Sequence, residues 1–234
     1  MAAALSENGK KVLVVDCDPQ GNTTTGFGID KNQLDNCVYN VLIESVPLTS
    51  IIREANGVFV APATINLAGA EIELVSLISR EYRLKKALEP LVGNYDFILI
   101  DCPPSLGLLT INALTAANGI LIPIQCEYYA LEGLSQLVTT IQLVKNNLNP
   151  QLNIEGVLLT MHDPRTNLSN QVVDEVKKYF PGQIFDSMIP RNVRISEAPS
   201  FGLPVLQYAP DSKGAIAYRA LAQEVLQNEQ TSSR

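Results

Sequence analysis

Short uninterrupted blocks of apolar residues recur along the chain and set the first expectation about its fold. Each block is three to five residues long, rich in Val, Ile and Leu, and does not alternate with polar positions. Strands that are apolar on both faces are typical of a parallel sheet covered on both sides. We therefore predict buried strands over residues 12–15, 58–61, 97–100, 120–124 and 157–159.

Longer segments between these blocks carry apolar residues at helical spacing. Strands that alternate with helices indicate right-handed crossovers, and hence a doubly wound α/β fold with a mostly parallel sheet and helices on both faces. No repeat or linker composition divides the chain, so we expect one domain over residues 1–234 with a polar tail from about 227. Helices are predicted over residues 67–88, 106–117, 131–148, 172–180 and 216–226.

Composition and charge narrow the classes of protein that fit. The 234-residue chain is 46% hydrophobic, but no apolar run approaches the ~18 residues that span a bilayer. This predicts a soluble protein. We expect it in the cytoplasm and not on a membrane, because its C-terminal end is polar and lacks the aromatic anchor of a membrane-binding helix. The net charge of −7 excludes a uniformly basic nucleic-acid binder. However, residues 1–150 carry a net charge of −6 and residues 151–234 only −1, so the second part has room for a local basic patch.

The four cysteines occur singly, with no C-x-x-C pair. Cys17 and Cys102 lie in or beside strand-like blocks, which is typical of reduced core thiols in the cytoplasm. A metal or cluster site is the alternative, and it would need paired cysteine ligands.

Polar residues follow three of the predicted strands at the carboxyl ends, where such sheets bind ligands. D-C-D-P-Q-G-N follows the first block, D-C-P-P-S the third and T-M-H-D the fifth. Carboxylates gathered at one edge repel one another unless a cation or hydrogen-bond donors lie among them. Mg²⁺ held by one or two carboxylates and by substrate phosphates fits that chemistry. Each Asp could instead be a helix cap or a turn residue.

Three long motifs, in chain order, resemble the ParA/Soj family: V-L-V-V-D-C-D-P-Q-G-N, F-I-L-I-D-C-P-P-S-L-G and I-P-R-N-V-R-I-S-E-A-P-S-F-G-L-P. These proteins are P-loop ATPases with a deviant Walker A motif that partition chromosomes and plasmids. The resemblance runs from about residue 2 to residue 226. It implies the P-loop NTPase fold, with ATP and Mg²⁺ as cofactors. It also implies a nucleoid-associated protein that forms an ATP-dependent homodimer, binds DNA non-specifically and is stimulated by a ParB-like partner.

The resemblance also implies roles for residues at matching positions. Asp101 resembles a Walker B aspartate that holds Mg²⁺ through water, Asp16 would help to organise the metal shell, and Asp18 would orient the attacking water. A carboxylate near the γ-phosphate suits phosphoryl transfer, which needs positioning and charge neutralisation more than covalent chemistry. By the same resemblance, the nucleotide base would contact Thr160, Met161, Pro190 and Asn192, and DNA would contact Arg165 and Arg194.

The family's K-G-G-x-G-K-[ST] string, whose N–H groups and lysines would cradle the phosphates, does not occur in the sequence. The chain opens with M-A-A-A-L-S-E-N-G-K-K, which resembles the end of the helix that follows this loop. We therefore expect the first strand and the P-loop to be missing from an incomplete record of a longer ATPase. Three other interpretations stay open: a natural pseudo-ATPase that serves as a binding module, a MinD-like membrane ATPase, and a relative that carries an iron–sulfur cluster.

Overall fold

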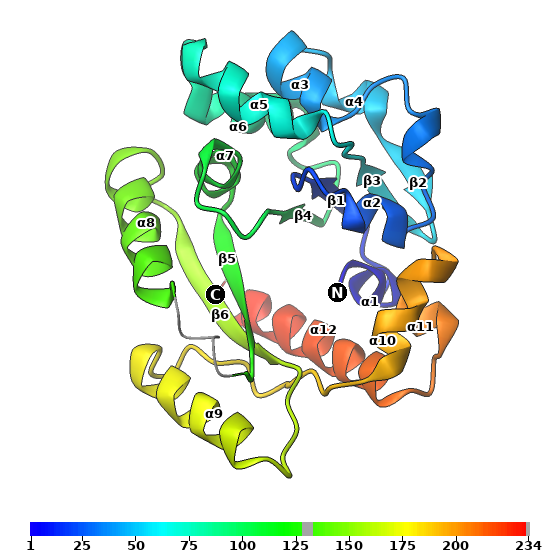
Figure 1. Ribbon diagram of the computed structural model, residues 1–234, viewed down its shortest axis with the longest axis vertical. Helices are drawn as coiled ribbons and strands as arrows, with labels where there is room; N and C mark the ends of the chain where they lie inside the picture. Colours follow the sequence, from blue (N-terminus) through cyan, green and yellow to red (C-terminus); the bar gives the residue numbers. More distant parts are fainter. Residues whose placement is uncertain (128–132, 233–234) are drawn as a thin grey trace.

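The strands of the protein lie in two sheets (Figure 1). The structure, a computed structural model, describes residues 1–127 and 133–232, with the backbone alone at 230–232. Four strands form one sheet in the order β2-β3-β1-β4, and two form the other, β5-β6. Every pairing is parallel except that of β2 with β3. The strands are β1 (Val12–Asp16), β2 (Arg53–Ala55), β3 (Val58–Ala61), β4 (Phe97–Asp101), β5 (Gly119–Gln125) and β6 (Asn153–Thr160).

Helices surround the sheets (Figure 1). They connect successive strands except β2 and β3, as the alternating pattern predicts, and several are too short to have been recognised from apolar spacing. The helices are α1 (Ala2–Glu7), α2 (Asn22–Gly26), α3 (Val38–Glu44), α4 (Leu48–Ile51), α5 (Leu67–Glu73), α6 (Arg83–Leu88), α7 (Leu108–Ala116), α8 (Leu134–Asn147), α9 (Asn167–Tyr179), α10 (Val193–Glu197), α11 (Val205–Tyr208) and α12 (Lys213–Ser232).

Strand β1 shows why its sequence has no polar alternation. Leu13 and Val15 are buried in a core that includes residues of α3, α5 and α6. Val12 and Val14 point to the opposite face and are buried in a core that includes residues of α1 and α12. Because both faces of this strand are covered, the doubly wound α/β prediction is confirmed.

The second sheet is covered in the same way. Ile122 and Ile124 of β5 belong to a core formed with α8 and α9, whereas Leu158 of β6 packs in a cluster that includes residues of α12. Helix α12 therefore contributes to the cores of both sheets.

All five predicted strands are confirmed, but two features of the sheets were not anticipated. Strand β2 was missed because it is a short edge strand with exposed Arg53 and Glu54, and it lacks an apolar block. The sheet is also divided: within the described residues, β4 and β5 each pair with a strand on one side only. The apolar residues of β4 are accordingly only half-buried. The expected lack of a first strand stays a prediction.

The prediction of one helix over 67–88 was wrong. The chain leaves the helix after Ser76, Leu77 is extended, and Ser79 is left-handed with φ of 54° before α6 begins. Buried Asn112 of α7 stabilises this break, because its Nδ2 donates to the carbonyl of Arg80 at 2.9 Å and its Oδ1 accepts from Leu84 N at 3.1 Å. Apolar spacing cannot show such a long-range contact.

The other predicted helices are confirmed with shifted ends. Residues 131 and 132 of the segment 131–148 lie outside the described residues, and α8 accounts for most of the remainder. Helix α9 starts five residues earlier than predicted because the Thr166 side chain caps it, accepting from Ser169 N at 3.3 Å. The polar residues from about 227 continue α12 as far as residue 232. Its Gln and Glu residues favour helix without needing a buried face.

The prediction of core thiols is confirmed for Cys17, whereas Cys102 is half-buried. All four thiols are free, and Cys17, Cys37 and Cys126 are buried. Burial raises the pKa of Cys102 to about 12, so this thiol is protonated at neutral pH. Within the described residues, no helix has the length and apolar character to cross a bilayer.

Candidate functional site

The carboxyl ends of β1 and β4 bring a group of carboxylates together. Asp16 pairs in register with Asp101, and the N–H of Cys17 donates to the Asp101 carbonyl at 2.8 Å. Asp18 follows two residues after Asp16. Burial raises the pKa of both Asp101 and Asp16; the negative charge of Asp18 adds to the rise at Asp101, and that of Asp101 adds to the rise at Asp16. The three carboxylates therefore interact at one edge of the four-stranded sheet, as the sequence predicted.

Asp16 is a fully buried hydrogen-bond acceptor. Its Oδ2 accepts from the N–H and hydroxyl of Thr24 at 2.8 and 2.6 Å, and its Oδ1 accepts from Asp18 N at 3.2 Å. The Thr24 hydroxyl in turn accepts from Ala63 N at 2.9 Å. Burial raises the pKa of Asp16, and the bonds from Thr24 oppose that rise. Asp16 thus ties the end of β1 to α2 and to the segment after β3.

Asp18 shapes the loop that follows β1. Its Oδ1 accepts from Gln20 N at 2.9 Å, and its carbonyl accepts from Gly21 N at 2.9 Å. The Lys31 ammonium donates to the Gln20 carbonyl at 2.7 Å. Oδ1 of Asp18 therefore has the role of a turn residue, which was the alternative interpretation. Among the described residues, Oδ2 of Asp18 has no hydrogen-bond donor.

Asp101 is more open than Asp16. It is exposed as a residue, and its Oδ2 accepts from the Thr23 hydroxyl at 2.6 Å. Desolvation nevertheless raises its pKa, with the charge of Asp18 adding to the rise. Sequence reasoning missed Thr23 and Thr24. The available signal was the run of three threonines directly after D-C-D-P-Q-G-N, at the start of a helix.

The residues of this edge fit Mg²⁺ only together with ligands from outside the protein. The described residues contain no group of three or more His, Cys, Asp or Glu side chains that could hold a metal ion. Two neighbouring carboxylates whose pKa values are raised by burial, with like charge adding to the rise, are nonetheless a suitable partner for a cation. Mg²⁺ is commonly held by one or two carboxylates, with phosphate oxygens and water completing its octahedron.

The four candidate nucleotide-binding residues lie near one another at the end of the second sheet. A bridge between His162 and Pro190 joins the segment after β6 to the loop before α10. Thr160 ends β6, and Met161 is left-handed with φ of 51°. Asn192 caps α10, its Oδ1 accepting from Arg194 N at 2.9 Å. The structure thus brings Thr160, Met161, Pro190 and Asn192 together, on a different sheet from the carboxylates.

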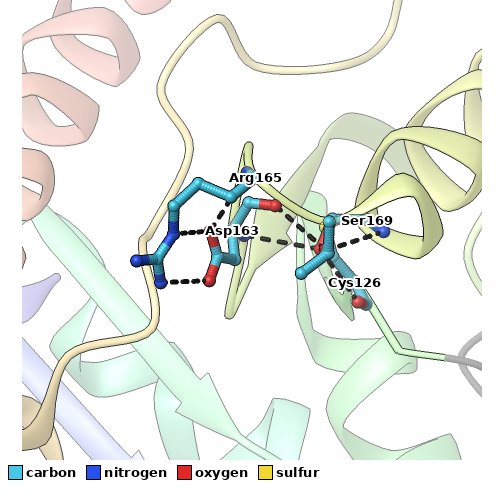
Figure 2. Close-up of polar contacts among 5 residues, drawn as sticks. Cys126, Asp163, Arg165 and Ser169 are labelled. Atoms are coloured by element: carbon cyan, nitrogen blue, oxygen red, sulfur yellow. Dashed lines mark hydrogen bonds and ion pairs between the residues drawn. The ribbon is translucent and has the colours of Figure 1, made fainter.

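Asp163 is held by its own loop rather than by the carboxylate edge (Figure 2). Its Oδ1 and Oδ2 accept from Nε and Nη2 of Arg165 at 2.9 and 2.7 Å. These bonds hold the pKa of Asp163 well below its usual range. The N–H of Asp163 contacts Ser169 Oγ at 3.4 Å, and that hydroxyl donates to the Cys126 carbonyl at 3.4 Å. The expectation that the carboxylate of T-M-H-D would join the other carboxylates is therefore wrong.

A pocket of about 510 Å³ lies beside this network. It is formed by the residues that follow β5 and β6, by the start of α9 and by the loop before α10. Its lining residues are Cys126, Glu127, Met161, Asp163, Thr166, Leu168, Ser169 and Arg191.

Both candidate DNA-binding arginines are on the surface. The Arg165 side chain is 86% exposed and that of Arg194 is 57% exposed. Each also has an acidic partner: Asp163 for Arg165, and Glu197 for Arg194 at 2.8 Å. The placement suits contact with a large ligand, and the role in DNA binding stays a prediction.

Comparison with known proteins identifies the family to which this chain is related. A family model described as an AAA domain matches residues 1–154. The chain is 59% identical to the sporulation initiation inhibitor protein Soj of Bacillus subtilis, over 97% of this chain and 91% of Soj. It is 52% identical to the chromosome partitioning protein ParA of Myxococcus xanthus, over 98% of this chain and 82% of that ParA.

Solved structures agree with the fold. The cobyrinic acid a,c-diamide synthase of Mycobacterium smegmatis, solved with an ATP analogue and magnesium, has a TM-score of 0.87 at 39% identity, covering 99% of this chain and 88% of that one. The septum site-determining protein MinD of Pyrococcus horikoshii, solved with Mg-ADP, has a TM-score of 0.77 at 26% identity, covering 96% of this chain and 86% of that one.

The fold, the carboxylate edge and these neighbours together define an α/β ATPase of the P-loop NTPase class, in which relatives bind adenine nucleotides with magnesium. Within that class, this chain belongs to the Soj/ParA family of chromosome-partitioning ATPases.

Proposed function

We propose that this protein is a partition ATPase that binds ATP with Mg²⁺, dimerises when ATP is bound, binds DNA without sequence preference and is stimulated by a ParB-like partner. We place it in the cytoplasm, associated with the nucleoid and not with a membrane. The carrying observation is the in-register pair Asp16 and Asp101, in a chain 59% identical to Soj. The lower identity of 39% to the diamide synthase favours partitioning over the activity for which that synthase is named.

The three carboxylates have different tasks in this proposal. Asp101, exposed at the edge, would hold Mg²⁺ through water, and the ion would neutralise phosphate charge. Asp16, whose Oδ2 accepts from Thr24 and whose Oδ1 accepts from Asp18 N, would fix the geometry around the metal. Asp18 uses Oδ1 to hold its turn, which leaves Oδ2 to accept a hydrogen bond from the attacking water.

The nucleotide base would bind at the second sheet. The bridge between His162 and Pro190 keeps Met161 and Asn192 on adjoining segments. Because Oδ1 of Asn192 caps α10, its Nδ2 is left to donate to a base. Thr160 and Pro190 would shape the same site.

Changing Asp18 to Asn tests the proposed water-orienting role. Asn keeps an oxygen for the turn but loses the negative charge, so we expect ATP turnover to fall by about 10- to 100-fold, the scale of losses caused by misplacing a reacting group. We expect Asp18→Ala to be trapped in the ATP-bound state. Phosphate release would be measured with Mg²⁺, DNA and the ParB-like partner present.

Asp30→Asn is the matched control for this experiment. Asp30 also accepts the N–H two residues ahead, from Asn32 at 2.9 Å, but it caps the turn that begins at Lys31 and does not follow a strand. Equal turnover in Asp18→Asn and wild type would remove Asp18 from the mechanism. The alternative of a pseudo-ATPase binding module predicts instead that wild type fails to bind Mg-ATP while still binding the ParB-like partner.

Charge reversal at Arg194 tests the DNA surface. We expect Arg194→Glu to weaken binding to any duplex by about tenfold at low salt, because a phosphate contact and its counterion release are lost. Nucleotide affinity should not change. Arg53→Glu, on the exposed edge strand β2, carries the same charge change and should bind DNA more tightly than Arg194→Glu. Equal binding by these two variants, measured by fluorescence anisotropy, would count against this surface.

A further inference from the structure

The arginines of the proposed DNA surface are already engaged by carboxylates of the same chain. Arg165 gives Asp163 two parallel hydrogen bonds, at 2.9 and 2.7 Å, and Figure 2 shows the guanidinium lying against the carboxylate. This fork-to-fork geometry is also the one by which arginine binds a phosphate. A DNA phosphate and the Asp163 carboxylate therefore compete for the same N–H groups.

Arg194 repeats the arrangement on α10. Its Nη1 donates to Oε2 of Glu197 at 2.8 Å, and the Tyr208 hydroxyl donates to the same oxygen at 3.2 Å. Arg191, between the two, pairs with Glu127, and its charge also lowers the pKa of Asp163. Each of the three arginines Arg165, Arg191 and Arg194 is thus paired with a carboxylate.

The exposure of these pairs makes them reversible. The side chains of Arg165 and Arg194 are 86% and 57% exposed, and exposed ion pairs contribute little to stability. They can therefore open without unfolding the loop or α10. The Asp163 turn survives such opening, because Oδ1 also accepts from the N–H of Arg165 at 3.1 Å.

We propose that Asp163 and Glu197 compete with DNA phosphates for Arg165 and Arg194, so that the DNA surface is partly occupied by its own carboxylates. This inference rests on the proposed function and deepens it. DNA must displace two ion pairs before both arginines contact phosphate. The carboxylates hold the affinity for DNA below what the arginines alone would give, which keeps binding weak and reversible.

The test compares Asp163→Asn and Glu197→Gln with wild type on a labelled random-sequence duplex, using the full chain with Mg-ATP. Both replacements keep an oxygen that can accept the local hydrogen bonds but lose the charge. We expect each to bind about two- to fivefold more tightly, the size of an exposed ion pair expressed as an equilibrium constant. Asp186→Asn is the charge-matched control, because Asp186 is exposed and forms no ion pair among the described residues.

A double variant separates local competition from a general change in charge. In the double variant Asp163→Asn/Arg165→Gln, the increase in DNA affinity caused by Asp163→Asn should disappear. If Asp163→Asn and Glu197→Gln increase the affinity for DNA no more than Asp186→Asn does, the competition is refuted, but the proposed DNA surface is not. If Arg165→Gln and Arg194→Glu bind DNA as wild type does, the proposed DNA surface itself is wrong and the competition falls with it.

Discussion

Replacing Asp16 with Ala is expected to lower the free energy of unfolding by about 3–5 kcal/mol, a large share of the roughly 5–15 kcal/mol that stabilises an ordinary domain. Asp16 is fully buried and accepts three hydrogen bonds, two of them from Thr24. Ala would leave the buried N–H of Thr24 without its acceptor and would detach the Thr24 hydroxyl that binds Ala63. Urea denaturation followed by circular dichroism would measure the loss.

Asp101→Ala is the matched control for this prediction. Asp101 is the in-register neighbour of Asp16, but it is exposed and accepts one side-chain hydrogen bond, from Thr23. We expect a change of less than about 1 kcal/mol, because removing one of two repelling carboxylates offsets the lost bond. If the two variants shift the urea midpoint equally, Asp16 does not anchor the loop as we infer.

The contrast between these aspartates also bears on the mechanism. Asp16 lies deeper and uses both oxygens inside the protein, whereas Asp101 is open on the sheet edge. An activity lost in Asp16→Ala could therefore reflect a displaced loop, while an activity lost in stable Asp101→Ala would reflect the metal. Comparing the two separates positioning from metal binding.

The sequence predicted what local patterns determine. The apolar blocks were sufficient for five strands because both faces of each strand are covered, and parallel strands place their carboxyl ends at one edge. This is why Asp16, Asp18 and Asp101 could be grouped before their positions were known. The same grouping was wrong for Asp163, because the side chain of Arg165, two residues later, binds its carboxylate within its own loop.

Long-range contacts account for most of what the sequence could not predict. The Thr24 hydroxyl donates to Asp16 and accepts from the N–H of Ala63, which lies 39 residues further along the chain. The break in the predicted helix 67–88 depends on Asn112 from another helix. Neither contact leaves a periodic signal, because each is a single polar side chain whose partner is fixed only by the fold.

The third sequence motif also depends on a long-range contact. Breaking that contact is expected to lower the free energy of unfolding about as much as the change at Asp16. Gly202, in S-F-G-L-P, is left-handed with φ of 64°, and a Cβ placed on it would lie 2.7 Å from the Cα of Gly28. Gly28, just after α2, is left-handed as well. Asn56 closes the contact from the side, because its Nδ2 donates to the carbonyls of Phe27 and Gly202, both at 3.0 Å. The loop of the third motif thus packs directly on the segment that follows the first.

Gly202→Ala is therefore expected to cost about 2–5 kcal/mol of unfolding free energy, combining left-handed strain of about 1–2 kcal/mol with overpacking of about 1–3 kcal/mol. Gly182→Ala isolates the first contribution, because Gly182 has φ of 73° but nothing within 4 Å of its Cβ position. It should cost about 1–2 kcal/mol. Equal losses in the two variants would mean that the backbone contact with Gly28 is not needed. A larger loss at Gly202 would show that the loop carrying Pro190, Asn192 and Arg194 depends on its contact with the segment after α2.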